Sequence, residues 1–327
     1  ASTSFLVCAQ VSGGLARVRP AMGKSGQVIP VIDIAPFAQE AAYDDAARAR
    51  VAREWDEAMT DIGFAIIEGH GVAAERIGAL REASLAFFAQ DAEEKLAFHY
   101  GPYGNPLGGY TGIGTEAVAR TRDSHGSDGG VEREPKRMRQ SVPDLVESFI
   151  FKPESPRPAP VAIAAAAGAY RQEILRVLGC LHRLTAAALG LPPNFFDAYY
   201  EPHADVSLRL AYYPPLSPEQ QSSTAVRYGE HTDYTGFTIL LQDEHDVGDL
   251  DAGGLQVRLS SGEWHAVVPR SGAFVVNIGD LYEVWTNGRW RSTVHRVLKP
   301  AAGSPAGAAP RLSVPCFTGP HRDAVIE

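Results

Sequence analysis

Five polar residues in the C-terminal third of the chain suggest a specific chemistry. His231 and Asp233 are separated by one residue, His295 follows later, and Arg311 and Ser313 come shortly after it. Two imidazoles and one carboxylate on one face of an octahedral ferrous ion leave the other coordination positions open, as an oxygen-activating centre requires. The sequence therefore predicts an iron site next to a binding site for an acid.

The spacing of the three metal-ligand candidates suggests strands. Residues two apart on a strand face the same side, so His231 and Asp233 could bind one metal from a single strand. His295 lies in a β-branched stretch over residues 290–297, after the turn signal Thr286-Asn287-Gly288. We predict that this stretch is a strand entered from a hairpin.

Arg311 and Ser313 alternate with Leu312, so both are expected to point into one cavity. A guanidinium can bind a carboxylate through two parallel hydrogen bonds, and a hydroxyl can add another. The pair is therefore predicted to anchor an acid.

Each of these residues also has a structural interpretation. A second His-x-Asp motif, His203-Ala204-Asp205, is interpreted as residues that end secondary-structure elements. Either His231 or His295 alone would be more typical of a hydrogen-bonded core histidine than of a ligand. Their joint occurrence with Arg311 and Ser313 favours the metal site. Asn277 and Asp280 are interpreted as turn-forming.

Beyond these residues, the chain resembles the non-haem Fe(II)- and 2-oxoglutarate-dependent dioxygenases of the isopenicillin N synthase-like group. The resemblance covers roughly residues 28–327, and several ordered motifs are more specific than a lone His-x-Asp. Besides the region around His231, the matching segments are 29–33, 63–71, 109–111, 143–149, 208–215, 277–280 and 295–297.

The resemblance implies a mainly β protein with supporting helices and a double-stranded β-helix (jelly-roll) core. It implies that Fe(II) is held by His231, Asp233 and His295, that 2-oxoglutarate is held by Arg311, Ser313 and Tyr213, and that O2 is the cosubstrate. A small organic molecule would be hydroxylated, desaturated or cyclised with release of succinate and CO2. Ala211 stands where plant relatives usually have asparagine, which removes one contact to the oxoacid.

Three other functions compete with this interpretation. Some oxidases of the same fold use iron without 2-oxoglutarate and also carry an Arg-x-Ser motif. A degenerate site would instead make the chain a non-catalytic small-molecule binding module, which the intact His231, Asp233 and His295 argue against. A zinc hydrolase would require a nearby general base and would gain nothing from a carboxylate anchor.

Composition sets limits on partners and location. The 327 residues are 45% hydrophobic, enough for one catalytic domain. A net charge of -9 argues against nucleic acid as a partner. The three cysteines, Cys8, Cys180 and Cys316, are too few and scattered for a disulfide framework, so a reducing compartment is expected. No apolar run is long enough to cross a bilayer. We expect a cytoplasmic monomer.

The chain is expected to begin with a flexible tail over residues 1–27, whose composition also resembles a transit segment for organelle targeting. Residues 28–200 are predicted to form a helical and strand region and 201–327 the catalytic core, with 28–327 as one structural unit. Helices are predicted over 44–61, 73–90 and 160–189, with a capping box at Asp91 and Glu94. Long irregular connections are usually functional or disordered, so the insertion 121–143 is predicted to be mobile or part of a substrate lid. Strands are predicted over 208–213, 235–242, 255–259, 264–268, 273–278, 293–298 and 312–317.

Overall fold

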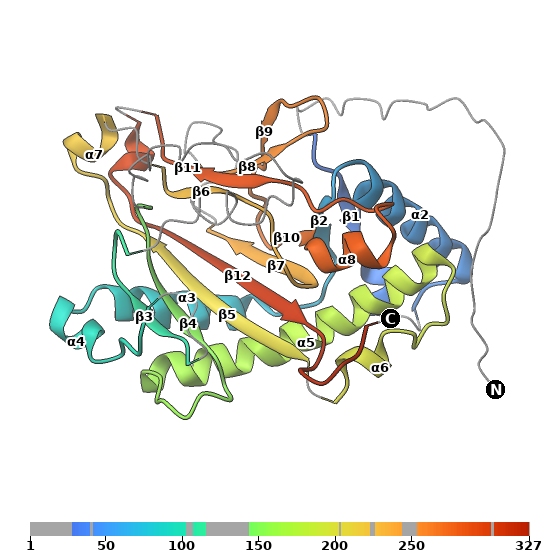
Figure 1. The fold of residues 1–327 in the computed structure, drawn as a ribbon, viewed down its shortest axis with the longest axis horizontal. Helices are drawn as coiled ribbons and strands as arrows, with labels where there is room; N and C mark the ends of the chain where they lie inside the picture. The colour runs from blue at the N-terminus through green and yellow to red at the C-terminus, as the bar shows by residue number, and fades with distance from the viewer. Residues whose placement is uncertain are drawn as a thin grey trace, which may run out of the picture.

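The computed structural model consists of two β-sheets with helices packed on the outer face of the larger one (Figure 1). It describes residues 28–39, 42–102, 107–115, 144–202, 204–222, 226–243, 254–301 and 304–326. The predicted tail 1–27 and the predicted lid 121–143 lie outside these residues.

The larger sheet has eight strands, and its neighbouring strands are antiparallel except for β1 and β2, which are parallel. In spatial order its strands are β1 (Val31–Asp33), β2 (Phe64–Glu68), β10 (Phe274–Ile278), β7 (Phe237–Gln242), β12 (Arg311–Gly319), β5 (Asp205–Tyr213), β4 (Glu147–Phe151) and β3 (Gly109–Thr111). The strands of the N-terminal half thus extend both edges of the sheet that the C-terminal half forms.

The smaller sheet lies over the larger one and carries two of the metal-ligand candidates. Its strands, in spatial order, are β6 (Tyr228–His231), β11 (His295–Leu298), β8 (Gly254–Arg258) and β9 (Trp264–Ala266). The two facing sheets confirm the predicted jelly-roll core. The division into regions at residue 200 stays a prediction.

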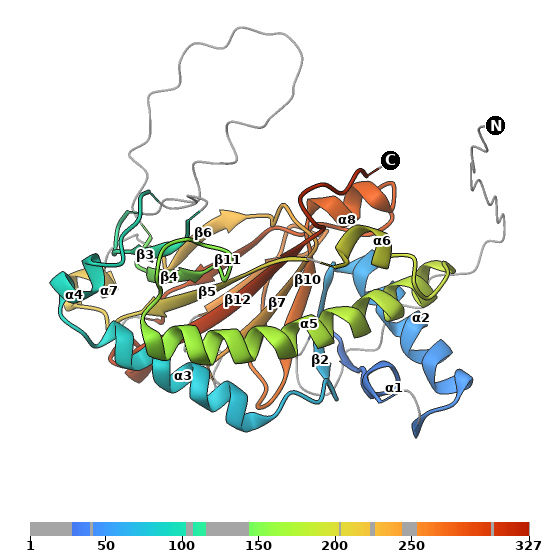
Figure 2. The ribbon, with the colours of Figure 1, turned by 90° about the horizontal axis from the view of Figure 1, so that it is seen from below.

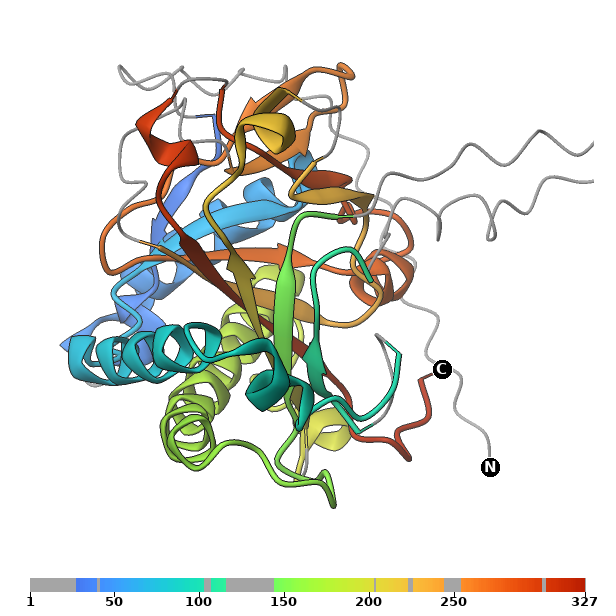
Figure 3. The same cartoon turned by 90° about the vertical axis from the view of Figure 1, so that its left-hand side faces the viewer.

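The long helices α3 (Ala74–Phe88) and α5 (Val161–Leu189) cover the side of the larger sheet that faces away from the smaller one (Figure 3). The longest helix, α5, crosses beneath this sheet with α3 alongside it (Figure 2). The helices are α1 (Ala35–Ala38), α2 (Asp45–Asp61), α3 (Ala74–Phe88), α4 (Ala92–Leu96), α5 (Val161–Leu189), α6 (Asp197–Tyr200), α7 (Pro218–Ser222) and α8 (Asp280–Trp285), with a 3-10 helix at Pro305–Gly307. The described helices include none whose length and hydropathy would let it span a bilayer.

The three long helices confirm the prediction from periodicity. Along α5, one apolar stripe packs inward and is almost fully buried, and the helix ends at Gly190 in the left-handed conformation that glycine favours. The Asp44 side chain accepts the Ala47 N–H at the start of α2. Asp91 and Glu94 form the predicted capping box of α4. The helices and their ends could be predicted from the sequence because these signals involve residues that are close together in the chain.

Two local predictions near the site were wrong, namely the hairpin before His295 and the turn at Asp280, which is the first residue of helix α8 (Asp280–Trp285). The turn at Thr286-Asn287-Gly288 does not open a hairpin but ends α8, where the Gly288 N–H donates to the Glu283 carbonyl. The helix α8 itself was not predicted, because six residues give too short a periodic pattern. It is held by Tyr282, whose ring stacks on that of Phe237 at 4.5 Å.

A buried histidine in the helical layer predicts acid sensitivity. His182 on α5 is 6% exposed, and burial, with a smaller effect from the Arg183 charge, lowers its pKa from 6.5 to about 3. Between these pH values the unfolded chain binds a proton that the folded chain excludes, so stability falls as pH falls from 6.5 towards 3. The loss amounts to at most about 1.4 kcal/mol per pH unit.

We expect His182→Phe to flatten this dependence, giving a smaller loss of unfolding free energy between about pH 6.5 and pH 4 than in the unsubstituted protein. Urea unfolding monitored by circular dichroism at each pH measures it. His321→Phe, which replaces a half-buried histidine, serves as the control. Parallel pH curves for the unsubstituted protein and His182→Phe would contradict the assignment.

Candidate active site

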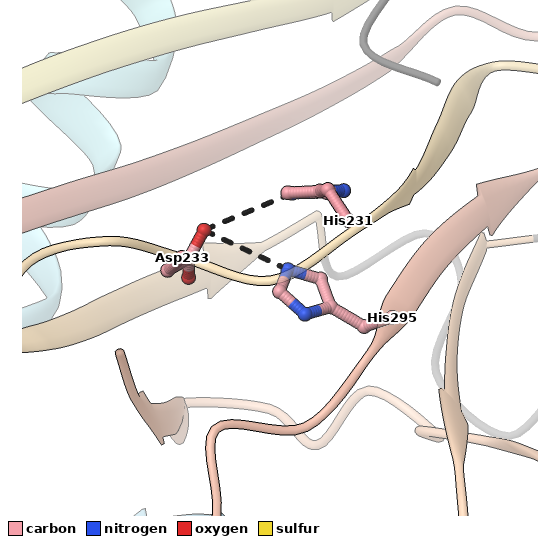
Figure 4. A group of neighbouring side chains, drawn as sticks. All are labelled: His231, Asp233 and His295. Atoms are coloured by element: carbon pink, nitrogen blue, oxygen red, sulfur yellow. Dashed lines mark ion pairs between the residues drawn. The ribbon is translucent and has the colours of Figure 1, made fainter. Parts of the chain in front are cut away.

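The structure brings His231, Asp233 and His295 together between the two sheets (Figure 4). The Asp233 Oδ1 atom lies 3.7 Å from His231 Nε2 and 3.8 Å from His295 Nε2. The potential ligand atoms all lie within 4.8 Å of one another. Among the described residues, this is the one group of three or more His, Cys, Asp or Glu side chains close enough to share a metal ion.

The strand prediction for these residues was partly wrong. His231 ends β6 and His295 begins β11, and the two residues are direct partners in the antiparallel pair. Asp233, however, lies beyond the end of β6 in the connection to β7. The carboxylate therefore reaches the imidazoles from a turn and not from the pleat of a strand.

Backbone carbonyl groups orient both imidazoles. His231 Nδ1 lies 2.9 Å from the Gly229 carbonyl oxygen, and His295 Nδ1 lies 3.0 Å from the Thr293 carbonyl oxygen. A carbonyl oxygen can only accept a hydrogen bond, so each Nδ1 carries the proton. Each Nε2 then presents its lone pair towards Asp233, as a metal ligand must.

Two polar side chains from the larger sheet fix the carboxylate. Asp233 Oδ2 accepts hydrogen bonds from Thr238 Oγ1 at 2.6 Å and from Asn277 Nδ2 at 2.7 Å. This leaves Oδ1 as the oxygen that faces the imidazoles. The interpretation of Asn277 as turn-forming was wrong, because it lies on β10 and binds Asp233. A polar residue in the buried strand β10 was the available signal for this role.

The turn that carries Asp233 is held by the start of α8. The Asp280 N–H donates to the Asp233 carbonyl oxygen and the Gly279 N–H donates to the Gly236 carbonyl oxygen, both at 2.8 Å. A Cβ atom at Gly279 would overlap the Thr235 carbonyl group, so this close approach requires glycine. The short helix therefore positions the carboxylate.

The electrostatics of the three side chains suit a divalent cation. Burial is the main cause that lowers the pKa of His231 to about 3, and the neighbouring His295 adds to it. Burial alone would raise the pKa of Asp233, but the two imidazoles and the hydrogen bonds from Thr238 and Asn277 outweigh it and lower that pKa. A neutral imidazole and an ionised carboxylate are the forms that bind a metal. This donor set fits ferrous iron.

The predicted acid anchor lines the same cavity as the three metal-ligand candidates. Arg311 and Ser313 on β12 are buried and lie opposite Tyr213 and Ala211 on β5. The Arg311 guanidinium carbon lies 5.3 Å from the centre of the Tyr213 ring. The structure thus places Arg311, Ser313 and Tyr213 side by side, and a buried guanidinium in a cavity wall fits a carboxylate ligand.

The strand register shows how far this anchor lies from the metal-ligand candidates. Thr238, which binds Asp233, is the partner of Phe317, whereas Ser313 is the partner of Gln242. The four-residue separation along β12 corresponds to about 13 Å between Cα positions. The cavity therefore extends along the strands from the metal-ligand candidates to the anchor.

The cavity contains a second arginine that sequence reasoning missed. Arg209 on β5 is 3% exposed, and its guanidinium carbon lies 4.5 Å above the centre of the Tyr228 ring. The Tyr228 ring in turn meets the His231 imidazole edge to face at 4.9 Å. A positive charge thus lies next to the metal-ligand candidates. Its signal in the sequence was an arginine between two leucines, Leu208 and Leu210, in a predicted strand.

We expect removal of the hydrogen bonds to Asp233 to weaken metal binding. Replacing Asn277 by Ala or Thr238 by Val leaves Oδ2 short of a donor, and such outer partners typically contribute roughly 10- to 100-fold to metal affinity. Anaerobic calorimetric titration with Fe(II) measures the change. Asn194→Ala, at an exposed asparagine, is the control. Unchanged affinity in both variants would contradict this role.

Comparison with protein families gives two matches that together cover most of the chain. Residues 198–320 match the model of the 2OG-Fe(II) oxygenase superfamily, and residues 29–169 match the model of the N-terminal region named for a non-haem dioxygenase in morphine synthesis. The first match contains every candidate site residue. The second covers β1 to β4 and the start of α5.

Named relatives and solved structures that are similar to this chain indicate the same family of oxygenases. The chain is 32% identical over 314 residues to a 2-oxoglutarate-Fe(II) type oxidoreductase from Metarhizium rileyi, covering 89% of this chain and 77% of that protein. It is 30% identical to a validamycin A dioxygenase from Streptomyces hygroscopicus, covering 85% and 73%. Its fold matches a full-length Neurospora crassa protein solved in complex with alpha-KG, with a TM-score of 0.75 and 28% identity, covering 93% and 89%.

Proposed function

This chain belongs to the 2OG-Fe(II) oxygenase superfamily and is an Fe(II)- and 2-oxoglutarate-dependent dioxygenase, and we propose which of its residues bind the iron and the 2-oxoglutarate. His231, Asp233 and His295 hold the iron. Arg311, Ser313 and Tyr213 hold the distal carboxylate of 2-oxoglutarate. The observation that carries the proposal is the convergence of the two Nε2 atoms on the one Asp233 oxygen that accepts no hydrogen bond from Thr238 or Asn277.

The iron and 2-oxoglutarate, when bound, supply the oxidation, in which O2 and the oxoacid give succinate, CO2 and one oxygen atom for a C–H bond of the substrate. The role of the protein is to fix both groups and to exclude water. The carbonyl groups of Gly229 and Thr293 hold the two imidazole rings so that each Nε2 is aimed at the metal. Apolar side chains, including Phe64, Leu240 and Phe317, line the cavity together with the metal-ligand candidates and the anchor.

The substrate proposed for this site is a small organic molecule, and hydroxylation is the proposed outcome. Relatives are named for reactions on small molecules, among them a homoarginine-6-hydroxylase of Glycine max and a gibberellin 2-beta-dioxygenase of Arabidopsis thaliana. One solved neighbour, JOX2, is in complex with 2OG, Fe and JA. We also propose that the protein acts as a cytoplasmic monomer without nucleic acid. The negative net charge argues against nucleic acid, and the buried thiols of Cys180 and Cys316, which form no disulfide among the described residues, support a reducing compartment.

The direct test of the proposed function measures succinate release and oxygen consumption by the Fe(II)-loaded protein, first without and then with candidate substrates. We expect slow succinate formation that depends on both iron and 2-oxoglutarate, and a faster rate when a substrate is present. Oxygen consumption that continues at the same rate without 2-oxoglutarate would instead indicate an oxidase that does not use the oxoacid.

A further inference from the structure

Asp243 is a buried carboxylate to which the proposed function gives no role. It directly follows the last residue of β7 and is 5% exposed. Its Oδ1 atom lies 3.2 Å from Arg81 Nε and its Oδ2 atom lies 3.5 Å from Arg81 Nη2, an ion pair with α3. Oδ2 also accepts the backbone N–H of Leu312 at 3.2 Å. A buried carboxylate is costly unless it is paired, and Asp243 is paired with both a helix and β12.

The Leu312 peptide group lies in the middle of the proposed acid anchor. Leu312 separates Arg311 from Ser313 on β12, and both of these line the cavity with the metal-ligand candidates. Side chains alternate along a strand, so the Leu312 side chain points to the opposite face, where it belongs to the core of the protein. A displacement of this peptide group would therefore move both proposed ligands of 2-oxoglutarate together.

The backbone pairing between β12 and β7 ends at this point. Its last pair is Ser313 with Gln242, whereas β12 continues to pair with β5 through Leu312 and Arg311. On the other side, the Leu312 N–H finds its acceptor in the Asp243 side chain. The carboxylate thus extends the sheet by one hydrogen bond, alongside the residues of the anchor.

A second cavity lies behind the anchor, so packing restrains this part of β12 incompletely. The cavity has a volume of about 210 Å³, and its walls include Leu312 and Val314 from β12, Ile77 and Arg81 from α3, and Asp243. Side chains beside an empty space lack contact atoms on one side and lose that part of the dispersion attraction. The hydrogen bond to Asp243 therefore supplies a restraint that packing on this face does not.

We propose that Asp243 is a positioning residue for the 2-oxoglutarate anchor, an inference that rests on the proposed function of Arg311 and Ser313. The Asp243 carboxylate fixes the Leu312 peptide group, and Arg81 fixes the carboxylate from α3. A helix of the N-terminal half thereby helps to set the affinity of the catalytic core for the oxoacid. Loss of a hydrogen bond to a charged group costs roughly 10-fold in an equilibrium constant.

The experiment measures 2-oxoglutarate binding by calorimetry on protein saturated with Mn(II), so that no turnover is required. In Asp243→Ala we expect 2-oxoglutarate to bind roughly 10-fold more weakly and Mn(II) to bind as before. Asp243→Asn keeps an oxygen for the Leu312 N–H but loses the charge, so its affinity should lie between those of Asp243→Ala and the unsubstituted protein. Arg81→Gln keeps the carboxylate and should weaken binding less than Asp243→Ala.

A second measurement and a matched control separate positioning from stability. Hydrogen–deuterium exchange of the Leu312 amide, measured without ligand, should be faster in Asp243→Ala. Glu147 on β4 makes a comparable buried ion pair with Lys95 of α4 at 2.8 Å, two strands away from β12. Glu147→Gln should lower the free energy of unfolding in urea, as Asp243→Ala does, but leave both the 2-oxoglutarate affinity and the Leu312 exchange unchanged.

Several results would overturn the inference. Unchanged 2-oxoglutarate affinity in Asp243→Ala would show that the hydrogen bond does not position the anchor. Equal weakening in Glu147→Gln would assign the loss to general destabilisation. If Asp243→Ala does not fold, unchanged affinity in Asp243→Asn overturns the inference in its place. Failure of the unsubstituted protein to bind Mn(II) or 2-oxoglutarate would instead refute the proposed function on which the inference rests.

Discussion

Asp233→Ala should abolish iron binding and turnover together. The carboxylate supplies the negative charge of the three-residue group and lies within 3.8 Å of both imidazole Nε2 atoms. Loss of an outer hydrogen-bond partner costs roughly 10- to 100-fold in metal affinity, and loss of the ligand itself should exceed that range. The variant also leaves Thr238 Oγ1 and Asn277 Nδ2 without their acceptor.

The sequence provides a matched control for this prediction. Asp205 belongs to the other His-x-Asp motif and is exposed at the start of β5. Asp205→Ala should bind Fe(II) and release succinate at the normal rate. Anaerobic metal titration followed by the succinate assay compares the two variants. Full turnover in Asp233→Ala, or loss of metal in Asp205→Ala, would contradict the ligand assignment.

Arg311→Ala should raise the concentration of 2-oxoglutarate needed for half-maximal rate far more than that of substrate. Truncation of one partner in a buried charge pair costs about 2 to 5 kcal/mol. This corresponds to a change of roughly 30-fold to several thousand-fold in affinity. The 2-oxoglutarate requirement of Arg311→Lys should lie between those of the unsubstituted protein and Arg311→Ala, because lysine keeps the charge but lacks the planar pair of donors.

Arg296→Ala is the matched control for the anchor. Arg296 follows His295 on β11, but its guanidinium lies over the Trp264 ring and pairs with Glu230, outside the cavity. It should therefore leave the 2-oxoglutarate requirement unchanged. Binding of the oxoacid by calorimetry in the absence of oxygen gives the same comparison without turnover. Equal weakening of oxoacid and substrate by Arg311→Ala would discredit the anchor.

The sequence was sufficient for the parts of the fold that depend on local patterns. The helices α2, α3 and α5 follow from apolar periodicity and end signals such as Gly190. The inner faces of β5 and β12 follow from alternation, which is why Arg311 and Ser313 line one cavity as predicted.

What sequence reasoning missed depends on contacts between distant segments. Asn277 and Thr238 reach Asp233 only because β10 and β7 are neighbours in the larger sheet. The strand β6 was expected only from the spacing of His231 and Asp233, and its pairing with β11, which places His231 opposite His295, was not predicted. Arg209 lines the same cavity as the metal-ligand candidates and the anchor, and this position follows from the pairing of β5 with β12. No periodicity encodes such pairings.

The structure locates Ala211, which stands where plant relatives usually have asparagine. This residue lies opposite Ser313 on β12 and opposite Ser148 on β4, and it lines the cavity. A methyl group there can donate no hydrogen bond, so the proposed oxoacid site depends more heavily on Arg311 and Ser313. The large effect expected for Arg311→Ala follows from this dependence.

A crystal structure of the protein loaded with Fe(II) and 2-oxoglutarate without oxygen tests the central proposal most directly. Anomalous scattering at the iron absorption edge should give one peak within about 2.0 to 2.2 Å of His231 Nε2, His295 Nε2 and an Asp233 oxygen, as for first-row divalent metals. The distal carboxylate of 2-oxoglutarate should lie against Arg311 and Ser313. An iron peak away from these three side chains, or an oxoacid bound elsewhere, would contradict it.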